Sequence, residues 1–287
     1  PRTMSFALVL GGGGLVGVAW EVGVLAGLAD AGIDPASAEL VAGTSAGSVV
    51  GTQLRQGRSI EALVAEQRES HGDANSPPPT TDLTPLIEIF ETLRSAKRRT
   101  PEVLRDVGRK AIAAETQPEA DWVGRFSSIV GEGGWPDRDL WITAVDCETG
   151  QRRVWTSADD VDLASAVASS CAIPGVFPPV TLAGSQYTDG GLWSSSNLDV
   201  VLDAAVDAAL FVGPLRAGDP TALRSLEREI EQVGAAGRRA DAVVPGDAFT
   251  DEIGARNLMN PSLRSRGVDL GIEDGTAAAR RVKALLG

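Results

Sequence analysis

Ser45 stands at the centre of GTSAG, residues 43–47, and so lies in a GxSxG pattern. This pattern is typical of a sharp strand-to-helix turn that exposes a nucleophilic serine hydroxyl. The apolar run before the motif and the helix-like sequence after it match that context. Gly43 and Gly47 would allow neighbouring backbone to pack closely around the turn. We therefore predict that Ser45 is a nucleophile; on this motif alone, a helix-capping serine in an ordinary turn is the alternative.

The base that would activate this serine is not a histidine. The chain has one histidine, His71, in a polar, proline-rich stretch, and none follows it to complete a serine–acid–histidine order. Another group must then accept the serine proton, and a carboxylate is the obvious candidate. Asp189 is the best-placed candidate because it follows the β-like SQYT, while Gly190 and Gly191 allow a sharp turn after it. An ordinary Asp-Gly turn is the alternative interpretation.

A run of glycines, GGGGLVG at residues 11–17, follows the first apolar segment and has two candidate uses. Gly12, Gly14 and Gly17 fit the GxGxxG spacing of a dinucleotide-binding turn. That use requires an acidic residue at the end of the second strand, whereas Glu39 lies at its start. We therefore expect no nicotinamide cofactor.

The second use is an oxyanion hole. Backbone N–H groups at a glycine-rich turn that opens a helix point toward the negative charge formed when a serine attacks an ester carbonyl. Gly12, Gly13 and Gly14 are the predicted donors. Adjacent parallel strands would place them beside Ser45.

The elements that must position these residues follow from the hydropathy pattern. Residues 5–10 and 39–44 are short apolar runs typical of buried parallel strands, and residues 15–31 and 45–56 have helical patterns. This strand–helix–strand–helix order predicts a mainly parallel sheet with right-handed crossovers. We expect a three-layer α/β/α fold.

The middle of the chain predicts a helical insertion at about residues 82–131, which could act as a lid over the sheet. Its apolar residues at helical spacing are candidates for lining a groove beside the serine: Leu86, Ile89, Phe90 and Leu93. One domain is expected over residues 1–287. Its parts would be a core at about residues 5–70 and 138–215, the insertion, and a C-terminal helical section at about residues 219–287.

Composition excludes several classes of function. The 287 residues carry a formal net charge of −13, which disfavours binding to nucleic acid. No apolar run reaches the roughly 18 residues of a membrane span, and the N-terminal text is unlike a secretory signal. Cys147 and Cys171 have no metal-ligand spacing, so we expect free thiols, a cytoplasmic location, and neither metal nor cofactor.

The motifs, in this order, resemble those of the patatin-like phospholipase family. The matching segments are the glycine loop at residues 12–17, GTSAG at 43–47 and DGG at 189–191. Residues 168–180, including Pro174, also resemble the family's approach to its aspartate. The resemblance covers about residues 5–215 apart from the helical middle section.

The resemblance implies a Ser–Asp dyad without histidine. Ser45 would attack an ester carbonyl to form an acyl-enzyme, and Asp189 would take its proton and then activate water. The N–H groups of Gly12, Gly13 and Gly14 would hold the oxyanion. The expected substrate is a phospholipid, a lysophospholipid or a simpler acyl ester, without calcium.

Two alternatives stay open. Val16 stands where family members commonly carry arginine or lysine, so a lipid- or acyl-binding regulatory protein with weak turnover is the second hypothesis; acyl transfer to an alcohol is a third. The middle section could pack with a solvated charged face or make transient contact with an anionic membrane surface. Its basic residues are Arg94, Lys97, Arg98, Arg99, Arg105, Arg109 and Lys110. The oligomeric state is not determined by the sequence.

Overall fold

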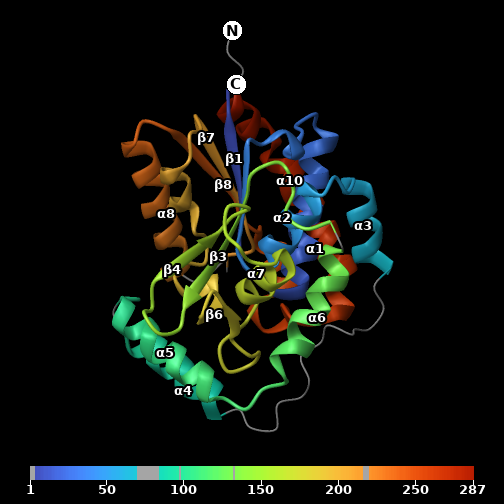
Figure 1. Ribbon diagram of the computed structural model, residues 1–287. Helices are drawn as coiled ribbons and strands as arrows, with labels where there is room; N and C mark the ends of the chain where they lie inside the picture. Colours follow the sequence, from blue (N-terminus) through green and yellow to red (C-terminus); the bar gives the residue numbers. More distant parts are fainter. Residues whose placement is uncertain (1–3, 70–83, 97, 132, 216–219) are drawn as a thin grey trace.

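The computed structural model describes residues 4–69, 84–96, 98–131, 133–215 and 220–287 (Figure 1). His71 and Lys97, which figured in the sequence interpretation, lie outside these residues. The first four elements are β1 (Phe6–Leu10), α1 (Gly14–Asp30), β2 (Leu40–Gly43) and α2 (Ala46–Arg55). β1 and β2 pair in parallel, which confirms the predicted strand–helix–strand–helix unit.

The described strands form one sheet in the order β5-β6-β3-β2-β1-β7-β8, with β4 paired to β3. The pairs β1–β2, β1–β7, β2–β3 and β7–β8 are parallel, whereas β3–β4, β3–β6 and β5–β6 are antiparallel. The remaining strands are β3 (Leu140–Asp146), β4 (Arg152–Trp155), β5 (Val180–Leu182), β6 (Ser185–Asp189), β7 (Ala208–Val212) and β8 (Arg239–Val243).

Two strands meet end to end along one edge of β3. Ile142 of β3 pairs with Gly43 of β2 and with β4, while Ala144 pairs with Asp189 of β6 and again with β4. Because a strand has only two edges, β2 and β6 must share the edge opposite β4. β6 runs antiparallel to β3, so the last residues of β2 and β6 face each other there.

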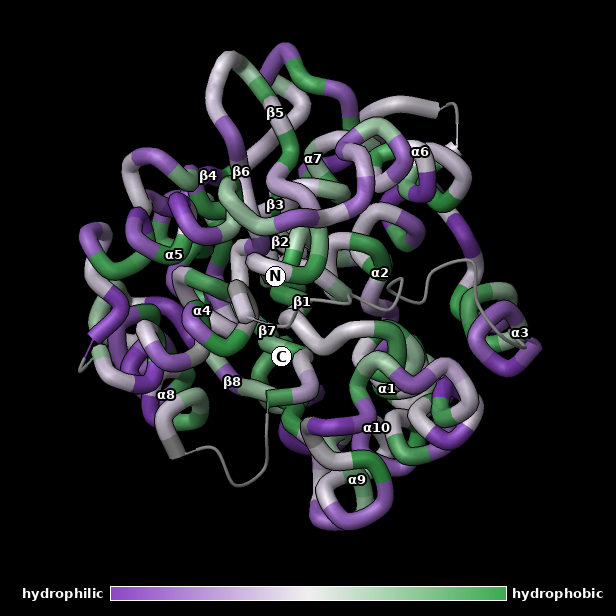
Figure 2. Tube along the Cα trace, turned by 90° about the horizontal axis from the view of Figure 1, so that it is seen from below, coloured by the Kyte–Doolittle hydropathy of each residue, from purple (hydrophilic) through white to green (hydrophobic). Residues whose placement is uncertain are grey.

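Helices cover both faces of this sheet, which confirms the expected layered α/β fold (Figure 2). The helices not yet named are α3 (Ile60–Glu69), α4 (Thr84–Ser95), α5 (Pro101–Ala113), α6 (Glu119–Val130), α7 (Leu163–Ser170), α8 (Pro220–Ala235), α9 (Asp247–Glu252) and α10 (Arg264–Leu286). Figure 1 shows α1, α2 and α10 on one side of the strands and α8 on the other.

Alternation along the central strand divides the core into these two layers. Leu8 and Leu10 of β1 pack in the cluster that contains the apolar side chains of α1, α2 and α10. Ala7 and Val9 point the other way and pack in the cluster that contains those of α8. A strand buried on both faces in this way reads as a continuous apolar run, as residues 6–10 do.

α10 packs directly against α1 through glycines. A Cβ on Gly23 of α1 would lie 2.3 Å from the carbonyl oxygen of Val268, and one on Gly271 of α10 would lie 2.2 Å from that of Trp20. Only glycine permits backbones to come this close. α1 is consequently buried between the sheet and α10, which explains why its sequence is apolar nearly all round.

Candidate active site

Ser45 occupies a strained turn between β2 and α2. Its backbone angles are φ 52° and ψ −115°, a conformation that residues with a side chain rarely adopt. The N–H of Ser45 donates to the Ser170 hydroxyl at 2.8 Å, and its carbonyl oxygen accepts from the Ser48 hydroxyl at 2.7 Å. Surrounding contacts therefore hold the turn in place.

Both glycines of GTSAG are required by close backbone packing. A Cβ on Gly47 would lie 2.3 Å from the carbonyl oxygen of Leu10, because α2 begins directly against the end of β1. A Cβ on Gly43 would lie 2.5 Å from the carbonyl oxygen of Gly47. The N–H of Gly47 also donates to the carbonyl oxygen of Gly11 at 2.9 Å, which joins this turn to the glycine run.

The glycine run lies beside Ser45 at the start of α1. A Cβ on Gly12 would come 3.5 Å from the Cβ of Ser45, and Gly14 adopts a positive φ of 63°. Among the described residues, the N–H groups of Gly12, Gly13 and Gly14 have no hydrogen-bond acceptor. They lie at the N-terminal end of a helix, where free donors and the helix dipole favour negative charge. Their geometry suits the predicted oxyanion role.

Val16 does not face this site. Its side chain is fully buried, and a Cβ on Gly267 of α10 would lie 3.0 Å from Val16 Cγ1. The N–H of Val16 donates to the carbonyl oxygen of Leu258 at 2.9 Å. The packing of α10 thus occupies the space that a long cationic side chain at this position would need.

Asp189 ends β6 and is 7% exposed. Its Oδ1 accepts from the N–H of Gly191 at 2.7 Å. Burial raises the pKa of Asp189 to about 6, although hydrogen bonding from the Gly191 N–H and the Ser45 hydroxyl partly offsets the effect. A Cβ on Gly190 would lie 2.3 Å from Thr143 Oγ1, so the glycine after the aspartate is needed for the chain to pass β3.

The shared edge of β3 explains how Ser45 and Asp189 meet. Ser45 lies two residues beyond Gly43, while Asp189 is the last residue of β6, and these strand ends face each other on that edge. Residues that are far apart in sequence are thereby placed at one point with the glycine run.

Asn197 joins the same segments and was not singled out by the sequence analysis. Its side-chain Nδ2 lies 3.1 Å from Thr44 Oγ1, 3.1 Å from the Gly190 carbonyl oxygen and 2.7 Å from the Ser194 carbonyl oxygen. The residue is fully buried and has a left-handed backbone, φ 47°. Asparagine tolerates that conformation better than most residues. An asparagine after three serines, residues 194–196, was therefore the only hint of this turn in the sequence.

Cys171 contacts the turn that holds Ser45. Its thiol donates to the carbonyl oxygen of Ser45 at 3.3 Å. Burial raises the pKa of this thiol well above its usual range, so it stays protonated and is a poor nucleophile. Cys147 is also a free thiol, and burial raises its pKa to about 12. Both cysteines are free, as predicted.

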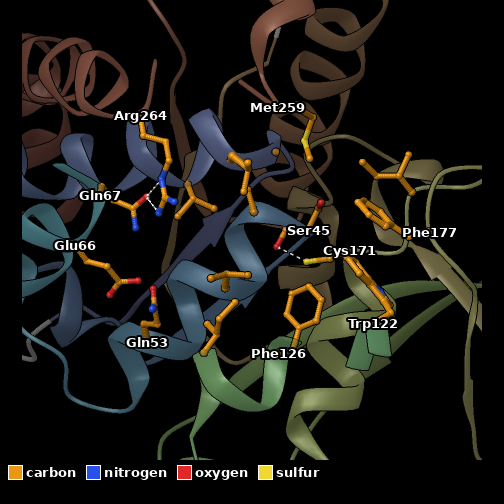
Figure 3. A pocket seen from close by; sticks show the side chains of 17 residues that line it. Ser45, Gln53, Glu66, Gln67, Trp122, Phe126, Cys171, Phe177, Met259 and Arg264 are labelled. Carbon is orange, nitrogen blue, oxygen red and sulfur yellow. Dashed lines mark hydrogen bonds between the residues drawn. The ribbon is translucent and has the colours of Figure 1, made fainter. Parts of the chain in front are cut away.

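A pocket opens beside Ser45 (Figure 3). Its apolar lining includes Trp122, Phe126 and Ile129 of α6. Trp122 stacks on Phe177 with ring centroids 3.8 Å apart. The other described residues that line it are Gly14, Leu15, Val18, Ala46, Val49, Gln53, Glu66, Gln67, Cys171, Ile173, Met259 and Arg264.

Two of the predicted groove-lining residues of α4, Ile89 and Leu93, are not among the residues that line this pocket. Ile89 and Leu93 instead pack with Leu104 and Val107 of α5, and α4 and α5 lie away from α6 in Figure 1. The side chains of Leu86 and Phe90 lie outside the described residues. For Ile89 and Leu93 the prediction was wrong, because an apolar helical stripe shows that a face is buried, not which partner covers it.

One basic residue of the insertion contacts the Asp189 turn. Arg99 donates to the carbonyl oxygens of Gly191 at 2.7 Å and Leu192 at 3.0 Å. Lys110 donates to Thr92 and pairs with Asp106. These side chains have structural partners, as the packed-helix interpretation expects.

The described part of the chain contains neither a metal-ligand cluster nor a membrane-spanning helix. No group of three or more His, Cys, Asp or Glu residues there could hold a metal ion. No helix there has the length and apolar character of a membrane span.

Residues 8–202 match the family model described as patatin-like phospholipase. The chain belongs to this family. A search of curated proteins found no match. Among solved structures, VipD from Legionella pneumophila is 12% identical, with a TM-score of 0.44 over 96% of this chain and 67% of VipD. ExoU bound to SpcU, from the type III secretion system of Pseudomonas aeruginosa, is 19% identical, with a TM-score of 0.42 over 100% of this chain. The chain spans 54% of that ExoU chain.

The family match includes all three motifs in full, since the glycine run, GTSAG and DGG all lie within residues 8–202. The β8 strand and α10 lie beyond the matched residues. They complete the sheet and cover α1, so the fold extends past the family match.

Proposed function

We propose that this protein is a lipid acyl hydrolase of the phospholipase A, lysophospholipase or carboxylesterase type, acting through a Ser45–Asp189 dyad. The observation that carries the proposal is a buried carboxyl group, its pKa raised to about 6, beside a serine in a strained turn. The unpartnered N–H groups of the adjacent glycine run support it. Membership of the patatin-like phospholipase family agrees with this class of reaction.

In the proposed reaction Asp189 is ionised at neutral pH and accepts the proton from Ser45 Oγ as that oxygen attacks the ester carbonyl. The N–H groups of Gly12, Gly13 and Gly14 stabilise the negative charge on the tetrahedral intermediate. Protonated Asp189 then gives its proton to the leaving alcohol, and an acyl-enzyme remains. Asp189 next removes a proton from water, which attacks the acyl-enzyme. As the second tetrahedral intermediate collapses, Asp189 returns this proton to Ser45 Oγ, and the acid is released.

A base with a pKa near 6 suits this cycle. It is ionised before attack, yet its conjugate acid is strong enough to protonate a departing alkoxide. The apolar walls of the pocket, formed chiefly by α6 and the segment after α7, would hold the acyl chain.

The decisive experiment measures hydrolysis of short-chain nitrophenyl esters and of a lipid panel by the wild type and by Ser45→Ala and Asp189→Asn. Loss of activity in both variants, with unchanged unfolding temperatures or higher ones, is expected. Full activity in either variant would reject the dyad. A fluorophosphonate probe should label the wild type at Ser45. Lipid binding without labelling or hydrolysis would instead favour the binding-protein alternative.

We also propose transient contact with lipid surfaces through α4 and α5. Ile87 and Ile112 are exposed there, at 55% and 42%, within a section rich in arginine and lysine. Exposed apolar side chains beside basic ones favour an anionic interface. Co-sedimentation with anionic vesicles should exceed that with neutral vesicles, and Ile87→Ser should reduce it. No binding to either kind of vesicle would refute this contact.

Acyl transfer to glycerol and a cytoplasmic location stay predictions.

A further inference from the structure

The pocket has two chemically different ends. Figure 3 shows Trp122, Phe126 and Phe177 on one side of Ser45, and Gln53, Glu66, Gln67 and Arg264 on the other. An unsubstituted acyl chain would use the aromatic end. The polar end has no role in the hydrolysis proposed above, although its residues line the same pocket.

Gln53 is the residue at this end whose hydrogen bonding is incomplete. It is 2% exposed, and its Oε1 has no hydrogen-bond partner among the described residues. A buried polar atom without a partner is costly, and such atoms are rare in folded proteins. A group on a bound ligand that donates a hydrogen bond would satisfy it.

The distance from the nucleophile is set by α2. Ser45 immediately precedes this helix, and Ser45, Val49 and Gln53 all line the pocket at four-residue spacing. Residues so spaced lie on one helix face. At 1.5 Å per residue, Gln53 lies about 12 Å along the helix from Ser45.

The neighbours of Gln53 narrow the chemistry of the ligand group. Arg264, 8% exposed, donates from Nε and Nη2 to Oε1 of Gln67 at 3.1 and 2.7 Å. Glu66 pairs with Arg58 at 2.6 Å. A carboxylate has no proton to donate to Gln53 Oε1. A methyl end would leave Gln53 unsatisfied, whereas a hydroxyl both donates and accepts.

We propose that the polar end binds a hydroxyl group carried on the acyl chain of the substrate, beside Gln53, whose backbone lies about 12 Å along α2 from that of Ser45. The protein would then prefer esters of hydroxylated acyl chains to those of plain alkyl chains. This rests on the proposed hydrolysis, and it adds the substrate class.

The test compares nitrophenyl esters of ω-hydroxyalkanoates of increasing length with the matching unsubstituted esters. We expect kcat/KM to favour the hydroxylated ester by roughly tenfold or more at the length that reaches Gln53, and by little at shorter lengths. Gln53→Leu should abolish this preference. Equal values for both series at every length, or a preference that survives Gln53→Leu, would refute the proposal.

Thr52→Val is the matched control. Thr52 is a fully buried neighbour on α2 whose Oγ1 also lacks a partner among the described residues, but it does not line the pocket. Its replacement should keep the preference for hydroxylated esters. A preference for ω-carboxylate esters in the wild type would instead indicate that Arg264 selects an anion, and would overturn the hydroxyl assignment.

A binding measurement tests the polar end even if the protein does not hydrolyse esters. The free ω-hydroxy acids and the plain acids are titrated into the Ser45→Ala variant, and the thermal shift of unfolding is measured. Tighter binding of the hydroxy acids, lost in Ser45→Ala with Gln53→Leu, would support the polar end even if no ester were cleaved. Equal binding would refute it independently of the dyad.

Discussion

The side-chain amide of Asn197 lies 3.1 Å from Thr44 Oγ1 and ties the turn before Ser45 to the turn after Asp189. The same nitrogen is 3.1 Å from the carbonyl oxygen of Gly190, and Thr44 Oγ1 is also 2.7 Å from Thr143 Oγ1. These groups are buried, so their positions depend on one another. Asn197 is therefore a positioning residue for both members of the proposed dyad.

Replacement of Asn197 should affect turnover more than binding. Asn197→Gly keeps the left-handed backbone accessible but removes the amide, so the Ser45 and Asp189 turns lose a shared anchor. We expect kcat to fall roughly 10- to 100-fold with a small change in KM. Steady-state kinetics on a nitrophenyl ester, below the unfolding temperature of the variant, measure this. Unchanged kcat in a folded variant would contradict the positioning role.

The pH profile should report the buried carboxyl group. Asp189 acts as a base only when ionised, and its pKa is about 6, so kcat/KM should rise with pH through about 6 and level off above it. A profile that is flat from about pH 5 to 8 would show that another group controls the reaction.

Asp189 should also cost stability at neutral pH. Its pKa is raised from 3.8 to about 6 in the folded protein, so folding is favoured below pH 3.8 and this stabilisation is lost as the pH rises toward 6. The asparagine of Asp189→Asn does not ionise, so the variant does not lose stability in this way as the pH rises. The variant should be more stable than the wild type near neutral pH by up to about 3 kcal/mol, and the difference should vanish in acid. Urea unfolding at several pH values measures it.

Strain at Ser45 predicts a difference between two inactive variants. Ser45→Ala keeps a Cβ at φ 52°, whereas Ser45→Gly relieves the strain. Ser45→Gly should therefore be more stable than Ser45→Ala by about 1 kcal/mol, after allowance for the flexibility of glycine in the unfolded chain. Denaturant unfolding of Ser45→Gly and Ser45→Ala measures the difference in their free energies of unfolding. A less stable glycine variant would indicate that the turn is not strained.

Glu21 of α1 provides a second pH-dependent prediction, remote from the dyad. Its side chain is fully buried, and neither carboxyl oxygen has a well-formed hydrogen bond among the described residues, since the nearby Gly11 N–H donates to Val212 and only partly offsets the effect of burial. Burial raises its pKa well above 4.5, so the folded protein loses stability as the pH rises above that value. Glu21→Gln should therefore be more stable than the wild type near neutral pH, and the difference should shrink in acid, as urea unfolding at several pH values measures. A variant less stable at every pH would contradict this.

The local chemistry of the site is readable in the sequence because each motif carries its own structural requirement. GTSAG needs glycines where α2 meets β1, and DGG needs Gly190 where the chain passes Thr143. The alternation of segments predicted as strands and as helices likewise predicts the parallel pair β1–β2. These features depend on neighbours in sequence or on close backbone contact that only glycine allows.

Contacts between distant segments were decided by the tertiary structure. The sequence predicted a helical insertion at about residues 82–131 as a whole, but only packing could show that α6 lines the pocket while Ile89 of α4 faces α5. Strand patterns do not specify pairing, so the shared edge of β3 that joins the ends of β2 and β6 could not be derived from them. Asn197 and Gln53 gain their proposed roles from the same long-range packing. The sequence by itself determined which residues could do the chemistry, and the fold decided which of them meet, because side-chain contacts across a core depend on the whole chain.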